Sequence, residues 1–196
     1  MSDYEFIEYD FDDPSFLERY IGLPLLRLLG ERVYYRPFLS KISFAEEDNV
    51  LDFGCGAGES TRSIVNMLGA RGRVTGIDTS TFWLKHARKR LKDRSNVTLL
   101  HGDIRKTKHD VEHFDKVVII FVLHDIHPLD RPSIMESIVH TLKPGGQCCV
   151  HEPSRFTHGI DPEEVRKIMT DAGLKETQTW KKDNKWFQGI YTKGRD

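Results

Sequence analysis

VLDFGCGAG, residues 50–58, is a short apolar run that ends in three glycines at alternate positions. The run predicts a buried strand followed by a tight turn, because glycine adopts backbone angles that other residues avoid and lets a ligand approach the main chain closely. The residues that follow predict a helix over 58–69, and a helix N-terminus offers free N–H groups. This strand, turn and helix are typical of the first unit of a nucleotide-binding α/β fold.

The same alternation of strand and helix continues toward the C-terminus. Further strands are predicted at 73–78, 96–100, 116–123 and 147–152, and further helices at 80–92, 130–142 and 162–172. Two last strand-like stretches, 174–181 and 186–193, are separated by Asp183-Asn184 and predict an antiparallel hairpin. The sequence therefore predicts a doubly wound, Rossmann-like α/β fold with a seven-stranded, mostly parallel sheet that ends in this hairpin.

The segment before this alternation has a different pattern. Residues 1–45 show amphipathic helical spacing, interrupted at Gly22 and Pro24, and Pro37 is expected to kink or end the second helix. We therefore expect an N-terminal helical cap or lid over 1–45 and the α/β domain over 46–196.

Composition excludes several classes of protein. The 196 residues are 38% hydrophobic and 30% charged. This balance argues against a disordered chain, and no apolar run is long enough to span a bilayer. The acidic N-terminus lacks the features of a signal peptide, so we expect a cytoplasmic protein without membrane insertion, whose three cysteines are reduced. The net charge of −1 and the lack of a strongly basic patch argue against a nucleic-acid partner.

Acidic residues stand at the predicted carboxyl ends of three strands. They are Asp52, Asp78 and Asp103. Asp78 follows the glycine loop at the spacing of about 20 residues at which doubly wound folds place a carboxylate that accepts hydrogen bonds from ribose hydroxyls. These residues predict a nucleoside ligand at one edge of the sheet.

Five features together resemble the class I S-adenosylmethionine-dependent methyltransferases, over residues 50–193. They are LDFGCGAG, GIDTSTFWLKHARK, GDI, LKPGG before the fifth strand, and the terminal hairpin. Within this family, the sequence most resembles the compact ubiquinone/menaquinone-type C-methyltransferases, which act on small molecules. The other ligand considered for the glycine loop is a nicotinamide dinucleotide, although such sites more often space their glycines as G-x-G-x-x-G.

The resemblance implies a role for each residue of a cofactor site. Gly54, Gly56 and Gly58 would approach the methionine portion of S-adenosylmethionine, and Asp52 would brace their loop. Asp78 would bind the ribose hydroxyls, and Thr79 and Trp83 would flank the adenine. Asp103 and Ile104 would meet the amino edge and the face of the adenine. Phe121 would lie close to the sulfonium. Trp83 could equally be a core residue.

Histidines and carboxylates follow two strands that are neighbours in this family's sheet. His124, Asp125 and His127 follow the fourth strand, and His151 and Glu152 follow the fifth. Three interpretations remain open: packing and turn residues, a general base or substrate anchor, or a divalent-metal site. The catalytic candidates are His124, Asp125, His151 and Glu152, and the metal candidates are His124, His127, His151 and Glu152.

The predicted activity is in-line transfer of a methyl group from S-adenosylmethionine to a small-molecule acceptor. Two alternatives remain: a non-catalytic subunit that binds S-adenosylmethionine, and transfer of an aminopropyl group from the decarboxylated cofactor. The sequence favours no particular oligomeric state.

Overall fold

The computed structural model describes residues 12–13, 33–107, 111–155, 158–182 and 185–195. Most of the predicted cap, including Gly22 and Pro24, lies outside these residues. Within the described part of the chain, no helix is long and apolar enough to cross a membrane.

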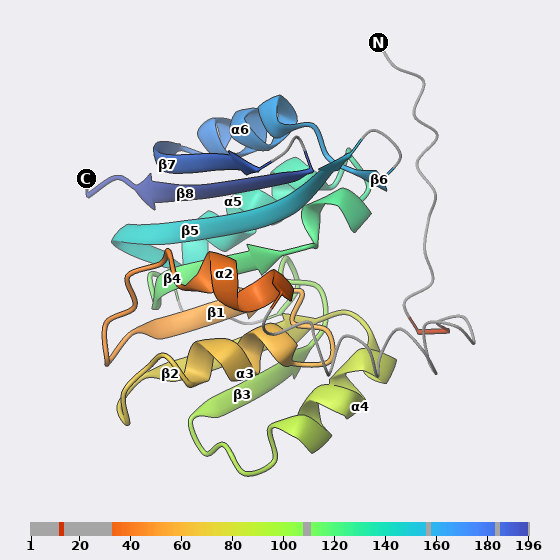
Figure 1. The fold of residues 1–196 in the computed structure, drawn as a ribbon, viewed down its shortest axis with the longest axis vertical. Coiled ribbons are helices and arrows are strands. Elements are labelled where there is room, and N and C mark those ends of the chain that lie inside the picture. The colour runs from red at the N-terminus through yellow and green to blue at the C-terminus, as the bar shows by residue number, and fades with distance from the viewer. Residues whose placement is uncertain (1–11, 14–32, 108–110, 156–157, 183–184, 196) are drawn as a thin grey trace.

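One mixed sheet forms the centre of the molecule (Figure 1). Its strand order is β3-β2-β1-β4-β5-β8-β7, with the short β6 paired to β5 outside this path. The strands are β1 (Asn49–Phe53), β2 (Arg73–Asp78), β3 (Val97–His101), β4 (Phe114–Ile120), β5 (Leu142–Arg155), β6 (His158–Gly159), β7 (Leu174–Lys182) and β8 (Trp186–Lys193). This arrangement confirms the predicted doubly wound fold and its C-terminal hairpin.

The direction of the strands determines where a ligand can bind. Strands β1 to β5 are parallel, whereas β8 is antiparallel to both β5 and β7. The chain moves outward from β1 to β3 and then crosses back to β4 on the other side of β1. Such a reversal opens a crevice at the carboxyl ends of the strands, which is where doubly wound folds bind ligands.

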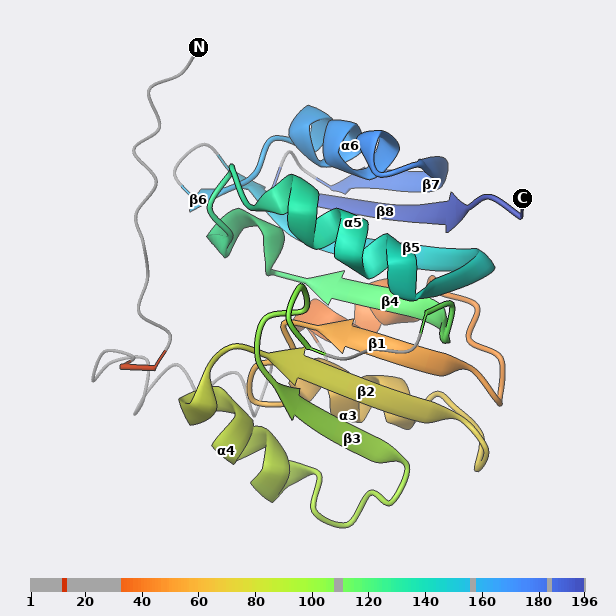
Figure 2. The same ribbon diagram turned by 180° about the vertical axis from the view of Figure 1, so that it is seen from behind.

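Helices cover the two faces of the sheet. In Figure 1, α2 (Arg36–Leu39) and α3 (Glu59–Val65) lie in front of the sheet, and α4 (Thr81–Arg90) lies toward its β3 edge. Figure 2 shows α5 (Arg131–Thr141) and α6 (Pro162–Asp171) on the opposite face. Each face has its own apolar core, and the neighbouring Cys148 and Cys149 belong to different ones, as their position within one strand predicts. All three cysteines are free.

The boundaries of two strands differ from the predictions. β4 ends at Ile120, three residues before the end of the apolar run, because Phe121 adopts a left-handed backbone with φ of 60°. β5 already begins at Leu142 and so includes LKPGG, because Leu142 pairs with Phe114 across a register shift in β4. Pro37 also differs from expectation: it lies in the first turn of α2, where a missing N–H costs nothing.

Candidate functional site

A cavity of about 490 Å³ opens at the carboxyl ends of β1 to β4. Its walls contain most of the residues predicted to bind the cofactor, which are Gly54, Gly56, Asp78, Thr79, Trp83, Asp103, Ile104 and Phe121. Asp125 also lines it, whereas His124, His127, His151 and Glu152 do not. The other two predicted cofactor residues, Asp52 and Gly58, do not line it.

The glycine loop forms part of the cavity wall through Gly54 and Gly56. Gly54, Gly56 and Gly58 have φ of 70°, 51° and 81°, a region that residues with a side chain rarely adopt. A Cβ atom at Gly54 would overlap the side chain of Val122, whereas one at Gly56 would meet nothing within 4 Å. The loop therefore presents bare backbone to the cavity, and Gly54 also allows the loop after β4 to approach.

Asp52 holds this loop to the helix that follows it. Its Oδ2 accepts hydrogen bonds from the hydroxyls of Ser60 (2.7 Å) and Thr61 (2.5 Å), both in α3. Burial raises the pKa of Asp52 to about 6, although the two hydroxyls counteract that rise. The carboxyl group thus ties the end of β1 to the start of α3.

Asp78 lies at the cavity wall and faces the glycine loop. Its Oδ2 accepts from the N–H of Gly56 and its Oδ1 from the N–H of Ser80, each at 2.8 Å. Burial raises its pKa, against the effect of these two donors. Next to it, Ser80 caps α4 by accepting from the N–H of Trp83 at 3.2 Å. The cap fixes the start of α4, so that the carboxylate and the Trp83 indole share one wall.

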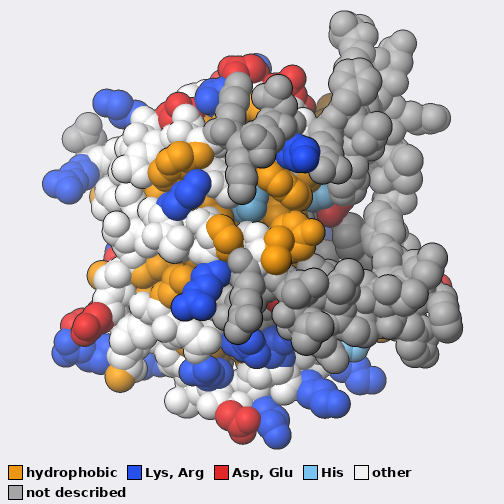
Figure 3. All heavy atoms as spheres, viewed as in Figure 1, with side chains coloured by type: hydrophobic (Ala, Val, Ile, Leu, Met, Phe, Trp, Pro, Cys, Tyr) orange, Lys and Arg blue, Asp and Glu red, His pale blue; other side chains and the backbone are white. Residues whose placement is uncertain are grey.

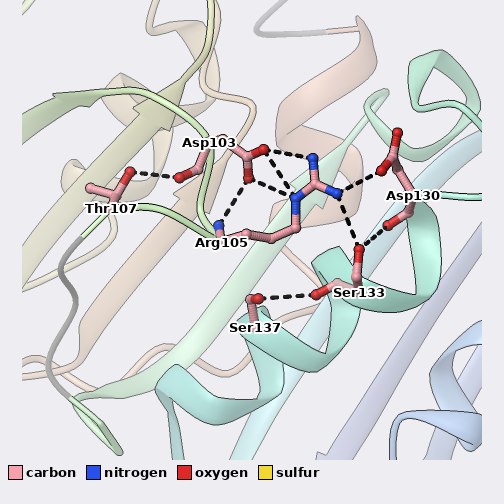
Figure 4. Close-up of polar contacts among 6 residues, drawn as sticks. All are labelled: Asp103, Arg105, Thr107, Asp130, Ser133 and Ser137. Carbon is pink, nitrogen blue, oxygen red and sulfur yellow. Dashed lines mark hydrogen bonds and ion pairs between the residues drawn. The ribbon is translucent and has the colours of Figure 1, made fainter.

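Asp103 is engaged by an arginine that the sequence analysis did not single out (Figure 4). The Arg105 guanidinium bonds both oxygens of Asp103, with a shortest N–O distance of 2.6 Å, and holds the pKa of that carboxyl below its usual range. Nη1 of the same guanidinium donates to Asp130 at 2.6 Å and to Ser133 at 3.2 Å, at the start of α5. Arg105 therefore ties the loop after β3 to α5.

Glu152 organises the loop after β4 from the neighbouring strand. Its Oε1 accepts from the N–H groups of Val122 (2.9 Å) and Leu123 (2.8 Å), and its Oε2 lies 2.7 Å from Nδ1 of His124. Nε2 of His124 lies 3.4 Å from the Asp125 carboxylate. Burial disfavours the charged imidazole, but these two carboxylates outweigh it and raise the pKa of His124. Of Glu152, His124 and Asp125, only Asp125 lines the cavity.

The other two histidines lie apart from this group. His151 is 4% exposed and contacts Phe38, Phe121 and Trp186, while the exposed His127 accepts from the N–H of Leu129. Among the described residues, no group of three or more His, Cys, Asp or Glu side chains is arranged to hold a metal ion.

Sequence reasoning missed two charged residues of the cavity wall, Arg105 and Glu59. Glu59 pairs with Arg90 of α4, and its position directly after Gly58 was the available signal. Arg105 follows Asp103 by two residues, but its partners on α5 could not be read from that spacing.

Comparison with known proteins is consistent with this geometry. Residues 50–146 match the family model described as a methyltransferase domain. The chain is 29% identical over 126 residues to a demethylmenaquinone methyltransferase of Staphylococcus epidermidis, covering 64% of this chain and 52% of the relative. It is 33% identical over 135 residues to a ubiquinone/menaquinone biosynthesis C-methyltransferase of Pseudomonas savastanoi, covering 67% and 52%. The chain thus spans about half the length of the curated relatives it matches.

A solved structure extends the comparison beyond the matched region. The N-methyltransferase NodS of Bradyrhizobium japonicum, solved with S-adenosylhomocysteine, superimposes with a TM-score of 0.65 at 23% identity and covers 94% of this chain and 93% of its own. At that identity the likeness shows the fold. With the matched family model, the strand order and the glycine loop, it means that this chain belongs to the class I S-adenosylmethionine-dependent methyltransferases.

Proposed function

We propose that this protein transfers a methyl group from S-adenosylmethionine to a small-molecule acceptor by in-line displacement. The observation that carries the proposal is that residues expected to bind the cofactor and residues expected near the acceptor line one cavity. The glycine loop and Asp78 are in the first group, and Phe121 and Asp125 are in the second. A donor and an acceptor held in one cavity react without the entropic cost of a bimolecular encounter. The quinone-precursor methyltransferases among the relatives support an acceptor that is a small molecule.

The residues present fit S-adenosylmethionine. The bare backbone of the glycine loop can approach the methionine portion, and the Asp78 carboxylate can accept from ribose hydroxyls. Trp83 offers an aromatic face and Ile104 an apolar one for adenine. When bound, the cofactor supplies an electrophilic methyl group on its sulfonium sulfur.

On the acceptor side, Asp125 is the residue we propose to face the acceptor. Asp125 lines the cavity, and its carboxylate contacts His124, which in turn contacts Glu152. A carboxylate oriented in this way can take a proton from an acceptor or anchor its donor groups. His124 and Glu152 then position Asp125 rather than touch the acceptor.

We propose that the candidate metal ligands hold no metal. Both ring nitrogens of His124 already face carboxylates, Nε2 of His151 faces Gln188, and His127 lies on the surface. The four candidate ligands, His124, His127, His151 and Glu152, therefore do not converge on one point. We expect protein purified without chelator to contain far less than one transition metal per chain by elemental analysis.

Calorimetric titration tests the cofactor. We expect S-adenosylmethionine to bind and NAD not to bind. Asp78→Asn should weaken S-adenosylmethionine by roughly 10- to 100-fold, because a hydrogen bond to a charged group is lost. Asp171→Asn is the matched control: it makes the same change in the exposed Lys167 pair at the end of α6 and should leave binding unchanged. Binding of NAD alone would refute the assignment.

Formation of S-adenosylhomocysteine with a panel of phenols, thiols, amines and activated carbon acids tests the reaction. Tight cofactor binding without product on any acceptor would favour a non-catalytic binding subunit. Turnover confined to the decarboxylated cofactor would favour aminopropyl transfer. Loss of turnover in Asp125→Asn with unchanged cofactor binding is the result expected if Asp125 faces the acceptor.

A further inference from the structure

His151 lies directly behind the cavity, on the face of the sheet that α2 covers. Its ring centroid is 4.7 Å from that of Phe121, which lines the cavity, and 5.5 Å from that of Trp186 at the start of β8. Phe38 of α2 packs against its other side at 5.2 Å. Figure 3 shows hydrophobic side chains and a histidine gathered over the carboxyl-terminal half of β5, above α2.

A chain of hydrogen bonds fixes the proton on the His151 ring. The Lys41 ammonium donates to Oε1 of Gln188 at 2.7 Å, and Nε2 of Gln188 lies 3.3 Å from Nε2 of His151. An ammonium can only donate, so the amide oxygen must face Lys41 and the amide NH₂ must face the histidine. Nε2 of His151 therefore accepts, and in the neutral ring the proton is on Nδ1.

The same surroundings keep the ring neutral. A protonated imidazole would turn an N–H toward the NH₂ group of Gln188, which also donates. Burial and the nearby Lys41 lower the pKa of His151 to about 3. Among the described residues, the ring of His151 contacts Phe121 directly after β4, Trp186 and Gln188 of β8, and Phe38 of α2, and none of these side chains carries a negative charge.

Nδ1 of His151 has no hydrogen-bond partner among the described residues, although the residue is only 4% exposed. Buried polar atoms are nearly always paired, so a lone buried donor indicates a partner that the described residues do not supply. His151 does not itself line the cavity, but Phe121, whose ring contacts it, does, so a ligand that moves the Phe121 ring aside could supply this partner. Phe121 also holds a strained left-handed backbone.

We propose that the Nδ1–H of His151 is a fixed, neutral donor that positions the methyl acceptor by binding one of its lone-pair atoms, a hydroxyl, carbonyl or carboxylate oxygen. The inference rests on the proposed function, because it assigns a partner to the acceptor half of the same site. A protonated amine has no lone pair and cannot bind in this way, so the donor selects oxygen-bearing groups at this point. His151 is thus a positioning residue and not the base of the reaction.

The first experiment measures the tautomer in the full ¹⁵N-labelled chain by long-range ¹H–¹⁵N NMR, with the His151 signals assigned by their loss in His151→Phe. We expect a neutral Nδ1–H ring that does not titrate between pH 5.5 and 8. Gln188→Glu should move the proton to Nε2, because a carboxylate accepts where the amide donated. An Nε2–H ring in the unsubstituted protein would overturn the proposal.

The second experiment titrates the protein saturated with S-adenosylhomocysteine with benzyl alcohol, cyclohexanone and benzylamine at pH 7. Benzyl alcohol and protonated benzylamine share a skeleton but differ in whether the polar group has a lone pair. We expect the two oxygen-bearing probes to shift the Nδ1–H resonance and benzylamine to leave it unchanged. No shift with either oxygen-bearing probe, or equal shifts with all three, would overturn the proposal.

Kinetics separates this inference from the proposed function. His151→Phe keeps an aromatic ring between Phe38 and Trp186, so it should raise the KM for an oxygen-bearing acceptor about tenfold, with a smaller change in kcat and none in cofactor affinity. An unchanged KM together with normal turnover would overturn the role of His151 and leave the proposed function standing. Absence of cofactor binding in the unsubstituted protein would refute the proposed function, while the tautomer measurement would still stand by itself.

Discussion

Two glycines of the loop after β1 differ in their surroundings, although both have a positive φ. A Cβ atom at Gly54 would overlap Val122, and one at Gly56 would point into open space. The loop is therefore constrained at Gly54 by packing and backbone together, and at Gly56 by backbone alone.

This difference predicts unequal effects of the same substitution. Gly56→Ala should lower the free energy of unfolding by about 1 kcal/mol, the cost of a left-handed backbone. Gly54→Ala should lower it by about 2–4 kcal/mol, because overpacking against Val122 adds to that cost. Urea denaturation of both variants measures the difference. Equal losses would mean that the contact with Val122 carries no cost.

A second prediction at this scale concerns pH. Folding raises the pKa of Asp52 from 3.8 to about 6, so the folded state binds the proton more tightly between these values. The contribution of Asp52 to stability is therefore complete well below pH 4 and is lost as the pH rises to 6, by about 3 kcal/mol. Asp52→Asn removes this dependence, because a neutral amide is not penalised for burial.

Urea denaturation of Asp52→Asn and of the unsubstituted protein at pH 4, 5, 6 and 7 tests this prediction. Relative to the unsubstituted protein, the variant should gain about 2 kcal/mol between pH 4 and 7, because part of the effect has already been lost at pH 4. Using the difference cancels the carboxylates that titrate in both proteins. A difference that stays constant with pH would contradict the prediction.

At the scale of elements, the turn from β4 into the 3₁₀ helix η3 (Leu123–Asp125) depends on β5. Glu152 is fully buried and accepts from two backbone N–H groups and one imidazole of that turn. The carboxylate thereby stops β4 before the apolar run ends and turns Asp125 toward the cavity. A side chain of one strand thus determines where its neighbour ends.

Removing this carboxylate should loosen the turn. Glu152→Ala leaves three buried donors without an acceptor and should cost about 3–5 kcal/mol. Glu152→Gln keeps one oxygen for the backbone, should cost less, and should lower the pKa of His124, because burial then acts with less opposition. Urea denaturation and NMR titration of His124 measure these effects. The control is Glu136→Ala on the exposed side of α5. As a surface substitution it should change stability by no more than about 0.5 kcal/mol.

At the scale of the molecule, the candidate site is assembled from the ends of β1 to β4, so binding there is coupled to the stability of the whole sheet. S-adenosylhomocysteine at a hundred times its Kd should raise the free energy of unfolding by about 2.7 kcal/mol. For a domain of this size that corresponds to a rise in Tm of roughly 5–11 °C. NAD should give no rise, and Asp78→Asn should reduce the rise with S-adenosylhomocysteine. Equal shifts with both ligands would contradict a specific cofactor site.

The order of the elements and the edge at which the site lies follow from the sequence alone. Apolar runs alternating with helical segments predict parallel strands, three glycines require a turn with positive φ, and Asp78 follows its strand at a fixed spacing. These are local properties, since each depends on residues close together in the chain. The edge that holds the candidate cavity was therefore predictable from the chain, whereas Trp83 and Phe121, which also line it, were expected from the resemblance to the methyltransferases.

Which polar groups meet depends on how the elements pack against one another. Glu152 reaches a turn 30 residues earlier, Arg105 joins Asp103 to Asp130, and Lys41 acts on His151 through Gln188. Such pairs depend on strand register and on the placement of α2 and α5 against the sheet, which the local pattern does not encode. The histidines that the sequence grouped together are therefore separated in the fold: His124 stands behind Asp125, His151 lies behind Phe121 and His127 is exposed.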